Sequence, residues 1–387
     1  MRFVFKIGTS LLTNEHGQLN VDFLRGVIAH MAEVQKQGNE VVLVSSGAVA
    51  AGRSELRFEH EKKNVPFRQA LAAVGQGVLM ETYRSFFKMH EVTVAQALLT
   101  NYDFINRENF LNTKNVFLLM LSHGVIPVVN ENDVTTIAEL KFGDNDMLSA
   151  KTAGMISADY LCILTDVDGL FEEDPKRNPD AKFLASVPVI DVGIRALAGG
   201  ARSSKSMGGM ITKITAAEYV TSVGTSMLIV NGHKKDILAR AVALCKKHVA
   251  HQSNLAHVGN NTLFAGDPDV GTFFPSSVNR MESQKKWMRP KIHKNAWIEV
   301  DAGARKALTA LGKSLLPSGI TGIHGDFVRG DVITIKDIQG NIGYGQVNYD
   351  AKDLDKIKKC HTDQIEKLLG YSFEDEAIHR DRMVIAQ

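Results

Sequence analysis

Short apolar segments alternate, over the first 231 residues, with longer segments whose apolar residues recur at helical spacing. The short segments occupy residues 2–8, 39–46, 92–99, 125–130, 160–166 and 226–231. The longer segments, with apolar residues three and four positions apart, occupy 21–38, 68–90, 107–124 and 212–224. Because strands that are apolar throughout must be covered on both faces, this alternation predicts an α/β fold. We expect a mainly parallel sheet between two layers of helices, a three-layer αβα sandwich.

The pattern changes near residue 275. Residues 275–292 are polar and basic and include Pro275 and Pro290, a composition typical of a linker. After them a short helical pattern precedes alternating strands that are separated by Gly-Asp and Gly-Asn turns, which predicts a small mixed β domain. We therefore expect a first domain at 1–274, a linker at 275–292, and a second domain with the C-terminal tail at 293–387.

The composition narrows the class of protein. The formal net charge is +2, so the whole chain offers no strong field for nucleic acid or an acidic membrane. The three cysteines, Cys162, Cys245 and Cys360, are far apart in the sequence, which indicates a reducing compartment and argues against a disulfide framework. We see no signal peptide and no apolar run of about 18 residues that would span a bilayer. These features predict a cytoplasmic protein that does not bind membranes.

Polar residues follow several of the predicted strands. Lys6, Ser46, Asn130 and Asp166 fall at strand ends, where parallel sheets bind their ligands. Glycine-rich turns that lead into helices suit an anion, because backbone N–H groups and the helix dipole converge there. The sequence has no P-loop motif and no GxGxxG after its first strand, so neither of those nucleotide folds is supported. Each loop taken alone also fits a simple tight connection.

Two lysines and several aspartates stand out among these loops. Lys6 lies in the apolar segment VFKIGTS, and burying a lysine is unfavourable unless a counter-charge reaches it. Lys213 ends a glycine-rich stretch, SKSMGGMITK, just where a helix is expected to begin. Both can place positive charge on a phosphate, and nearby carboxylates can orient them or hold Mg²⁺; these are Asp133, Asp144, Asp146 and Asp166. This combination favours phosphoryl transfer, which depends on positioning and charge stabilisation.

Less specific interpretations stay open for the same residues. Lys6 also fits a solvated strand edge. Asp144 and Asp146 also fit the N-cap of a helix that begins near Met147. For His248, His251 and His257, whose spacing matches no metal pattern, we expect solvated side chains.

In this order the loops resemble the amino acid kinase family over nearly the whole chain, including a C-terminal PUA domain. The segments that carry the resemblance are KIGTSLLT, VSSGAVAAGR, LAAVGQG, FLNTKN, PVVNENDVTT, KFGDNDMLSA, LTDVDGLF, GGMITK, SLLPSGI, GDFVRGD and HRDRM. The pairing of NEND with GDND points to the members that phosphorylate the side-chain carboxylate of L-glutamate with ATP, the first step of proline synthesis. The alternatives are another amino acid kinase, of the acetylglutamate kinase or aspartokinase type, and an RNA-binding protein that uses its PUA domain.

The resemblance implies a role for each matching residue. Lys6 and Lys213 would contact the transferred phosphoryl group, with Asp144 holding both lysines in place. The amino acid substrate would be bound by Ser46, Asp133, Asn145 and Asp146. The nucleotide would be bound by Lys6, Gly8, Thr165, Asp166, Met207, Gly208, Gly209, Met210, Ile211, Thr212 and Lys213. No metal ligand is assigned, since Mg²⁺ would be held mainly by the ATP phosphates.

The resemblance also implies partners and shows departures. The family forms homo-oligomers, dimers or tetramers, is commonly inhibited by proline, and passes its product to glutamate-5-semialdehyde dehydrogenase. Met207 stands where the family usually has threonine, and Ile211 replaces a small polar residue. The stretch 238–271 is longer than the family's usual connection and receives no role.

Overall fold

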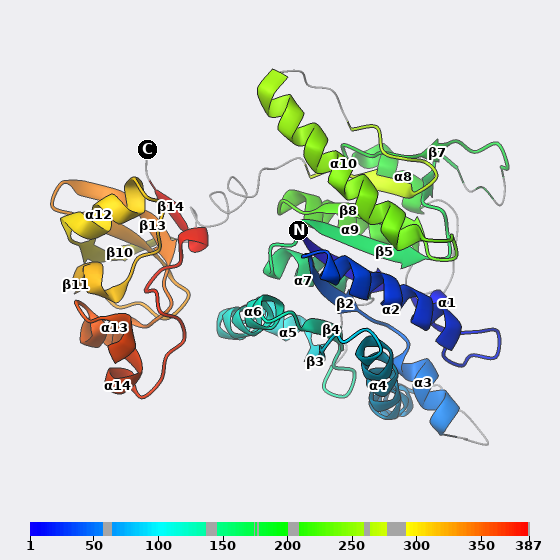
Figure 1. The fold of residues 1–387 in the computed structure, drawn as a ribbon, viewed down its shortest axis with the longest axis horizontal. Helices are drawn as coiled ribbons and strands as arrows, with labels where there is room; N and C mark the ends of the chain where they lie inside the picture. The colour runs from blue at the N-terminus through cyan, green and yellow to red at the C-terminus, as the bar shows by residue number, and fades with distance from the viewer. Residues whose placement is uncertain are drawn as a thin grey trace. The chain divides into compact units, whose positions relative to one another are not determined.

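The computed structural model describes residues 1–56, 64–136, 145–173, 175, 178–199, 209–258, 264–276 and 292–385. The chain divides into two compact units, Met1–Asn279 and Arg280–Gln387 (Figure 1). The division falls inside the expected linker at 275–292, most of which, residues 277–291, lies outside the described residues. Three candidate site residues, Asp144, Met207 and Gly208, also lie outside them.

A seven-stranded sheet in the order β3-β4-β2-β1-β5-β8-β9 forms the centre of the first unit. Its parallel strands are β1 (Arg2–Ile7), β2 (Glu40–Val44), β3 (Val94–Leu99), β4 (Ile126–Glu131), β5 (Tyr160–Thr165) and β8 (Ser226–Asn231). Each overlaps one of the predicted apolar segments, and the mainly parallel sheet is confirmed. The edge strand β9 (Gly271–Phe274), which the sequence analysis did not predict, pairs antiparallel with β8.

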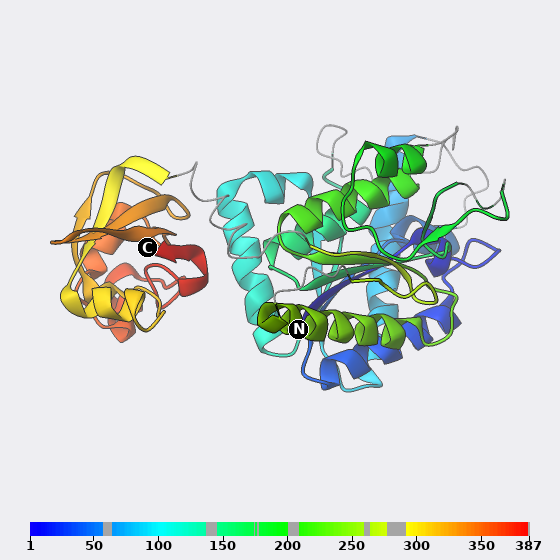
Figure 2. The same ribbon diagram turned by 90° about the horizontal axis from the view of Figure 1, so that it is seen from above.

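Helices cover both faces of this sheet (Figures 1 and 2). One face is covered by α2 (Val21–Lys36), α4 (Val65–Lys88) and α10 (Ile237–Val258). The other face is covered by α6 (Arg107–Ser122), α7 (Asn145–Met155) and α9 (Met210–Ser222). Alternate residues of β1 follow this division, because Phe3 and Phe5 lie in the first core and Val4 in the second. The predicted αβα sandwich is therefore confirmed.

Shorter elements complete the first unit. They are α1 (Thr9–Leu12), α3 (Ala48–Glu55), α5 (Asn101–Ile105), α8 (Val192–Gly199) and the strand pair β6 (Leu170–Phe171) and β7 (Phe183–Leu184). Helix α3 packs against α4 through two glycines: a Cβ on Gly75 would lie 1.8 Å from the main-chain oxygen of Ala48, and one on Gly52 would lie 1.9 Å from that of Leu71. This close approach fixes the loop that connects β2 with α3.

The unassigned stretch at 238–271 contains most of α10 and the approach to β9. On α10, the side chain of His248 is only 3% exposed, so the expectation that it is solvated is wrong. Its Nδ1 lies 3.1 Å from the hydroxyl of Tyr160, and its ring packs edge-on against Phe264 and Phe273. The Tyr160 hydroxyl donates to the main-chain oxygen of Cys245, so it accepts from Nδ1 of a neutral imidazole. Burial, and secondly the neighbouring His251, lowers the pKa of His248 to about 4.

This buried imidazole predicts a loss of stability in acid. As pH falls, the unfolded chain takes up a proton on His248 near pH 6.5, well before the folded chain does. The stability that the buried neutral imidazole contributes is therefore present above pH 6.5 and is lost as pH falls toward 4. Between pH 7 and pH 5 we expect a loss of about 2 kcal/mol in the free energy of unfolding. Urea unfolding at both pH values should show this loss in the wild type and in the exposed control His16→Asn, and a smaller one in His248→Asn. Equal losses in all three proteins would contradict the assignment.

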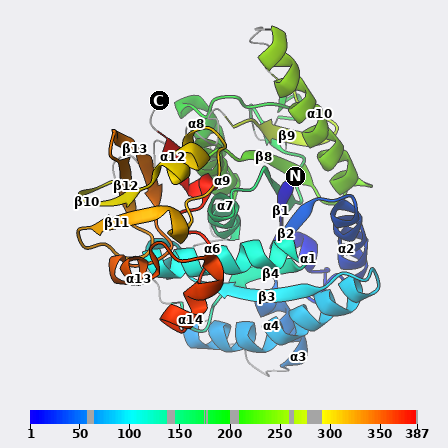
Figure 3. The ribbon, with the colours of Figure 1, turned by 60° about the vertical axis from the view of Figure 1, so that its left-hand side comes forward.

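The second unit is a small mixed β domain, as expected (Figure 3). Its five-stranded sheet has the order β11-β10-β12-β13-β14, with β10 and β12 parallel and the other neighbours antiparallel. The strands are β10 (Ile292–Val300), β11 (Ile320–His324), β12 (Val332–Asp337), β13 (Gly340–Gln346) and β14 (Met383–Ile385). The helices that accompany them are α12 (Ala302–Thr309), α13 (Ala351–Ile357) and α14 (Ile365–Leu369).

The C-terminal tail belongs to this second unit. Arg382 is buried and donates hydrogen bonds to Asn348 at 3.0 Å and to Glu374 at 2.9 Å, while Asn348 donates to the other oxygen of Glu374 at 2.8 Å. A buried charge pair of this kind is expensive to break, so it fixes the segment leading to β14. In the part of the chain that the structure describes, no helix combines the length and the apolar character required to cross a bilayer.

Candidate active site

Lys6 lies near the carboxyl end of β1, in the middle of the parallel sheet between β2 and β5. Its side chain is on the same face as that of Val4, toward α7 and α9, and Lys6 is only 5% exposed. The interpretation of Lys6 as a solvated edge residue is therefore excluded. A lysine buried to this degree requires a counter-charge.

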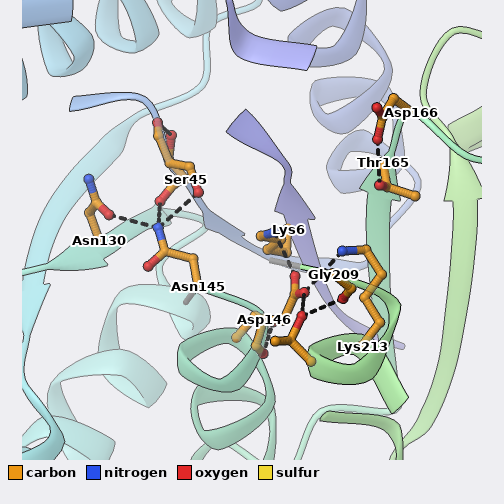
Figure 4. A network of polar contacts seen from close by, with 12 residues as sticks. Lys6, Ser45, Asn130, Asn145, Asp146, Thr165, Asp166, Gly209 and Lys213 are labelled. Carbon is orange, nitrogen blue, oxygen red and sulfur yellow. Dashed lines mark hydrogen bonds and ion pairs between the residues drawn. The ribbon is translucent and has the colours of Figure 1, made fainter. Parts of the chain in front are cut away.

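Asp146 supplies that counter-charge to two lysines (Figure 4). Its Oδ1 lies 2.6 Å from Nζ of Lys6, and its Oδ2 lies 3.1 Å from Nζ of Lys213. The hydroxyl of Thr212 donates to the same Oδ2 at 2.9 Å. The lysines come from β1 and α9 and the aspartate from the start of α7, so three separate elements meet at this point. The two lysines that the sequence analysis paired thus share one buried carboxylate.

The pKa of Asp146 reflects two opposed effects. Complete burial favours the neutral acid and by itself would raise the pKa. The charges of Lys6 and Lys213, together with the hydrogen bonds from Lys6 and Thr212, outweigh burial, so the pKa is lowered. The carboxylate is therefore ionised at neutral pH, and it holds two ammonium groups close together at the end of β1.

Asp146 makes the contact that the sequence analysis assigned to Asp144. The resemblance placed Asp144 between the lysines and gave Asp146 a role in binding substrate. Asp144 lies outside the described residues, so its role stays a prediction. Asp146 is 0% exposed, and this burial between two lysines suits a positioning residue better than a direct substrate ligand.

Asn145, the neighbouring residue, joins the ends of β2 and β4. Its Nδ2 lies 2.6 Å from the main-chain oxygen of Ser45, 2.9 Å from Oγ of Ser46 and 3.1 Å from Oδ1 of Asn130 (Figure 4). Two of the predicted substrate-binding residues, Ser46 and Asn145, are therefore in direct contact. The contacted residues belong to adjacent strands or to the loops that follow them, as expected for ligand sites in a parallel sheet.

Asp133, the third predicted substrate ligand, lies in the loop after β4. Helix α4 holds this loop, because Nε2 of Gln69 donates to the main-chain oxygens of Asp133 at 2.9 Å and Thr136 at 3.2 Å. Asp133 follows Asn130 by three residues, which places it near the end of β4 that Asn145 contacts.

The predicted nucleotide residues that the structure describes lie at the ends of β5 and β1 and at the start of α9. Thr165 ends β5, and its hydroxyl donates to Asp166 at 3.1 Å. The backbone N–H of Gly8 donates to Leu164 at 3.0 Å, and a Cβ on Gly8 would come within 3.2 Å of that oxygen. Gly209 occupies the N-cap of α9, followed by Met210, Ile211, Thr212 and Lys213. The paired lysines therefore lie between the β2–β4 group around Asn145 and the β5 group around Thr165, in the order of the strands (Figure 4).

Family models match two parts of this chain. The model described as the amino acid kinase family matches residues 1–231. The chain belongs to the amino acid kinase family. A second model, the PUA domain, matches residues 296–369 of this amino acid kinase.

Two full-length relatives of this amino acid kinase are named glutamate 5-kinase. A protein named glutamate 5-kinase from Caldanaerobacter subterraneus subsp. tengcongensis is 41% identical over 388 residues, which cover 100% of this chain and 98% of that protein. A glutamate 5-kinase from Carboxydothermus hydrogenoformans is 41% identical over 386 residues, covering 99% and 97%. Among solved structures, isopentenyl phosphate kinase aligns with a TM-score of 0.44 at 17% identity, over 63% of this chain and 96% of that chain.

Two residues near the site of this amino acid kinase were missed from the sequence. Gln76 and Tyr83, both on α4, are buried and reach the site: Oε1 of Gln76 accepts from Asn130 at 2.8 Å, and the hydroxyl of Tyr83 lies 2.7 Å from Oγ of Ser45. A signal was present, because Gln76 falls on the inward stripe with Ala72, Leu79, Tyr83 and Phe87. A polar residue in an otherwise apolar stripe indicates a buried polar contact.

Proposed function

We propose that this chain uses ATP to phosphorylate the side-chain carboxylate of L-glutamate, giving L-glutamyl 5-phosphate, the first step of proline synthesis. The observation that carries the proposal is the pair of buried lysines held by Asp146 at the carboxyl end of β1, between the two groups of predicted ligands. The full-length similarity to proteins named glutamate 5-kinase supports the choice of substrate over acetylglutamate or aspartate.

The proposed reaction needs no general base. The side-chain carboxylate of glutamate has a pKa near 4.3 and is already ionised at neutral pH. One of its oxygens forms a bond to the γ-phosphorus of ATP while the bond from that phosphorus to the bridging oxygen breaks, and ADP leaves. The obstacle is the repulsion between two anions, which Lys6 and Lys213 oppose as charge spreads over the transferred group.

ATP and Mg²⁺ are part of the proposal. Among the described residues, no group of three or more His, Cys, Asp and Glu side chains could hold a metal ion. We assign Mg²⁺ to the ATP phosphates, where it would neutralise part of their charge. Backbone N–H groups at the start of α9, after Gly209, suit the same phosphates.

The substrate pocket predicts discrimination by the α-amino group. We place the ammonium of glutamate against Asp133, so N-acetylglutamate, which lacks this cation, should be turned over at least about a hundredfold less efficiently. Comparison of kcat/KM for the two substrates checks this. With Asp133→Asn the preference should shrink, whereas an unchanged preference would show that another residue recognises the ammonium.

A hydroxamate assay tests the proposed function. Hydroxylamine traps an acyl phosphate as a hydroxamate, so the purified protein is incubated with ATP, Mg²⁺ and, in turn, glutamate, N-acetylglutamate and aspartate. Of the three acids, we expect only glutamate to give a strong hydroxamate signal. Product from N-acetylglutamate or aspartate instead would identify another amino acid kinase, and no product from any of them would reject the proposal.

Further parts of the proposal concern assembly and regulation. We propose a cytoplasmic homo-oligomer, a dimer or tetramer, that is inhibited by proline and passes its labile product to glutamate-5-semialdehyde dehydrogenase. RNA binding is the weaker alternative, because the formal net charge of the whole chain is only +2.

A further inference from the structure

Three amide side chains form a chain from helix α4 to the substrate pocket. Nδ2 of Asn130 donates to Oε1 of Gln76 at 2.8 Å, and Oδ1 of Asn130 accepts from Nδ2 of Asn145 at 3.1 Å. Gln76 and Asn130 are buried, and Asn145 is half-buried at the start of α7. This amide chain therefore joins an interior helix to a residue that is predicted to bind the amino acid substrate.

The direction of each amide follows from backbone groups that cannot reverse. The N–H of Glu131 points at Asn130 at 2.9 Å, so the atom that receives it must be oxygen. The main-chain oxygen of Ser45 faces Asn145 at 2.6 Å, so the atom that meets it must be nitrogen. With both asparagines fixed, the remaining nitrogen of Asn130 requires an acceptor, and Gln76 provides one.

The fixed direction decides what Asn145 offers to a ligand. Its nitrogen lies within hydrogen-bond distance of three oxygens, those of Ser45, Ser46 and Asn130, and its oxygen takes part in none of these contacts (Figure 4). An amide oxygen accepts hydrogen bonds and cannot donate them. It therefore suits an ammonium group and opposes a carboxylate, which is itself only an acceptor.

Gln76 is hard to explain by stability alone. It is 8% exposed, and its Nε2 has no hydrogen-bond partner within the described part of the chain. Burying an amide with an unsatisfied N–H group is unfavourable, and an apolar side chain of similar size would avoid this. The cost is understandable if the oxygen of Gln76 is needed by Asn130.

We propose that Gln76 is a positioning residue that holds Asn130 and Asn145 so that Asn145 presents its oxygen to the α-ammonium of the substrate. This inference rests on the proposed function. It adds a specificity device for the α-amino group that acts from α4, through two asparagines, beside the charge of Asp133.

The test uses two substrate analogues that retain the reacting carboxylate. Glutarate lacks the α-amino group, and 4-aminobutyrate lacks the α-carboxylate. The ammonium ratio is kcat/KM for glutamate divided by that for glutarate, and the carboxylate ratio uses 4-aminobutyrate in the same way. A general loss of structure lowers activity with all three substrates and leaves both ratios unchanged.

In Gln76→Met we expect the ammonium ratio to fall about tenfold, the effect of one lost hydrogen bond, with the carboxylate ratio within about twofold of the wild type. Gln76→Glu keeps an acceptor for Asn130 and should retain both ratios. Thr82→Val is the matched control, because it removes a half-buried side-chain hydrogen bond on the same helix outside the amide chain, and it should leave both ratios unchanged.

Other outcomes overturn the inference. If both ratios persist in Gln76→Met, Gln76 has no role in specificity. If the carboxylate ratio falls instead, Asn145 contacts the other end of the substrate. If Gln76→Met does not fold, a changed ammonium ratio in Gln76→Glu would be the contradicting result. A wild-type protein inactive with glutamate rejects the proposed function, which is a distinct result.

Discussion

Replacing Lys6 with alanine is expected to lower kcat at least about a hundredfold, because it removes a charge that opposes the negative charge of the transferred phosphoryl group. Nζ of Lys6 is held 2.6 Å from Asp146 in a buried position, where water cannot replace the lost ammonium. Steady-state kinetics with glutamate and ATP measure the effect. Lys213→Ala should behave similarly, since its ammonium is held by the same carboxylate.

Two controls separate chemistry from folding in this experiment. Lys182→Ala removes an exposed lysine paired with Glu172 and should leave kcat unchanged, because exposed pairs contribute little. Lys6→Arg keeps the positive charge but alters its shape, so a large loss there would show that the position of the ammonium matters as well as its charge. A normal kcat in Lys6→Ala would remove Lys6 from the mechanism.

Replacing Asp146 with asparagine is expected to reduce both stability and activity strongly. The change leaves two buried ammonium groups without their shared carboxylate, and breaking a buried ion pair by removing one partner costs about 3–5 kcal/mol. The lysines would also no longer be held together, so kcat should fall by about a hundredfold or more even where the protein stays folded. Urea unfolding and steady-state kinetics measure the two effects.

The acid dependence of the same variant gives a second check. Because the pKa of Asp146 is lowered in the folded chain, its contribution is present above the unfolded pKa and is lost as pH falls through the folded one. Asp146→Asn should therefore lose less stability than the wild type on acidification. The control is Asp353→Asn. The pKa of Asp353 is lowered by a hydrogen bond from Tyr371 at the surface, so this change should lower the free energy of unfolding by less than about 1 kcal/mol. Equal costs in the two variants would contradict the account.

The sequence predicted the sheet and the meeting of the two lysines well. Short apolar segments that alternate with helical patterns fit buried parallel strands, and parallel strands place their carboxyl ends together, so Lys6, Ser46 and Asp166 were expected at one edge. The strand β9 was missed because a four-residue apolar stretch does not reveal its partner or direction. His248 was misjudged because its burial depends on α10 and on Phe264 and Phe273, which lie further along the chain.

The detail of the site depended on tertiary structure. Asp144 and Asp146 are two positions apart, and the way α7 begins decides that Asp146 points at the lysines. The sequence left Asn145 able to bind either end of the substrate, because an amide has both a donor and an acceptor. Only the contacts with Ser45 and Asn130 fix its direction, and these residues come from two other parts of the chain.

The most direct test of the central claim, that paired lysines bring a carboxylate to the γ-phosphorus of ATP, is an isotope-transfer measurement. Glutamate labelled with ¹⁸O in its side-chain carboxylate is incubated with ATP, Mg²⁺, hydroxylamine and the full chain, and the released phosphate is analysed by mass spectrometry. Hydroxylamine breaks the bond between carbon and the bridging oxygen, so we predict phosphate that carries one ¹⁸O atom. At matched times Lys6→Ala should release at least about a hundredfold less of it. Unlabelled phosphate from the wild type would show that water is the acceptor and would contradict the account.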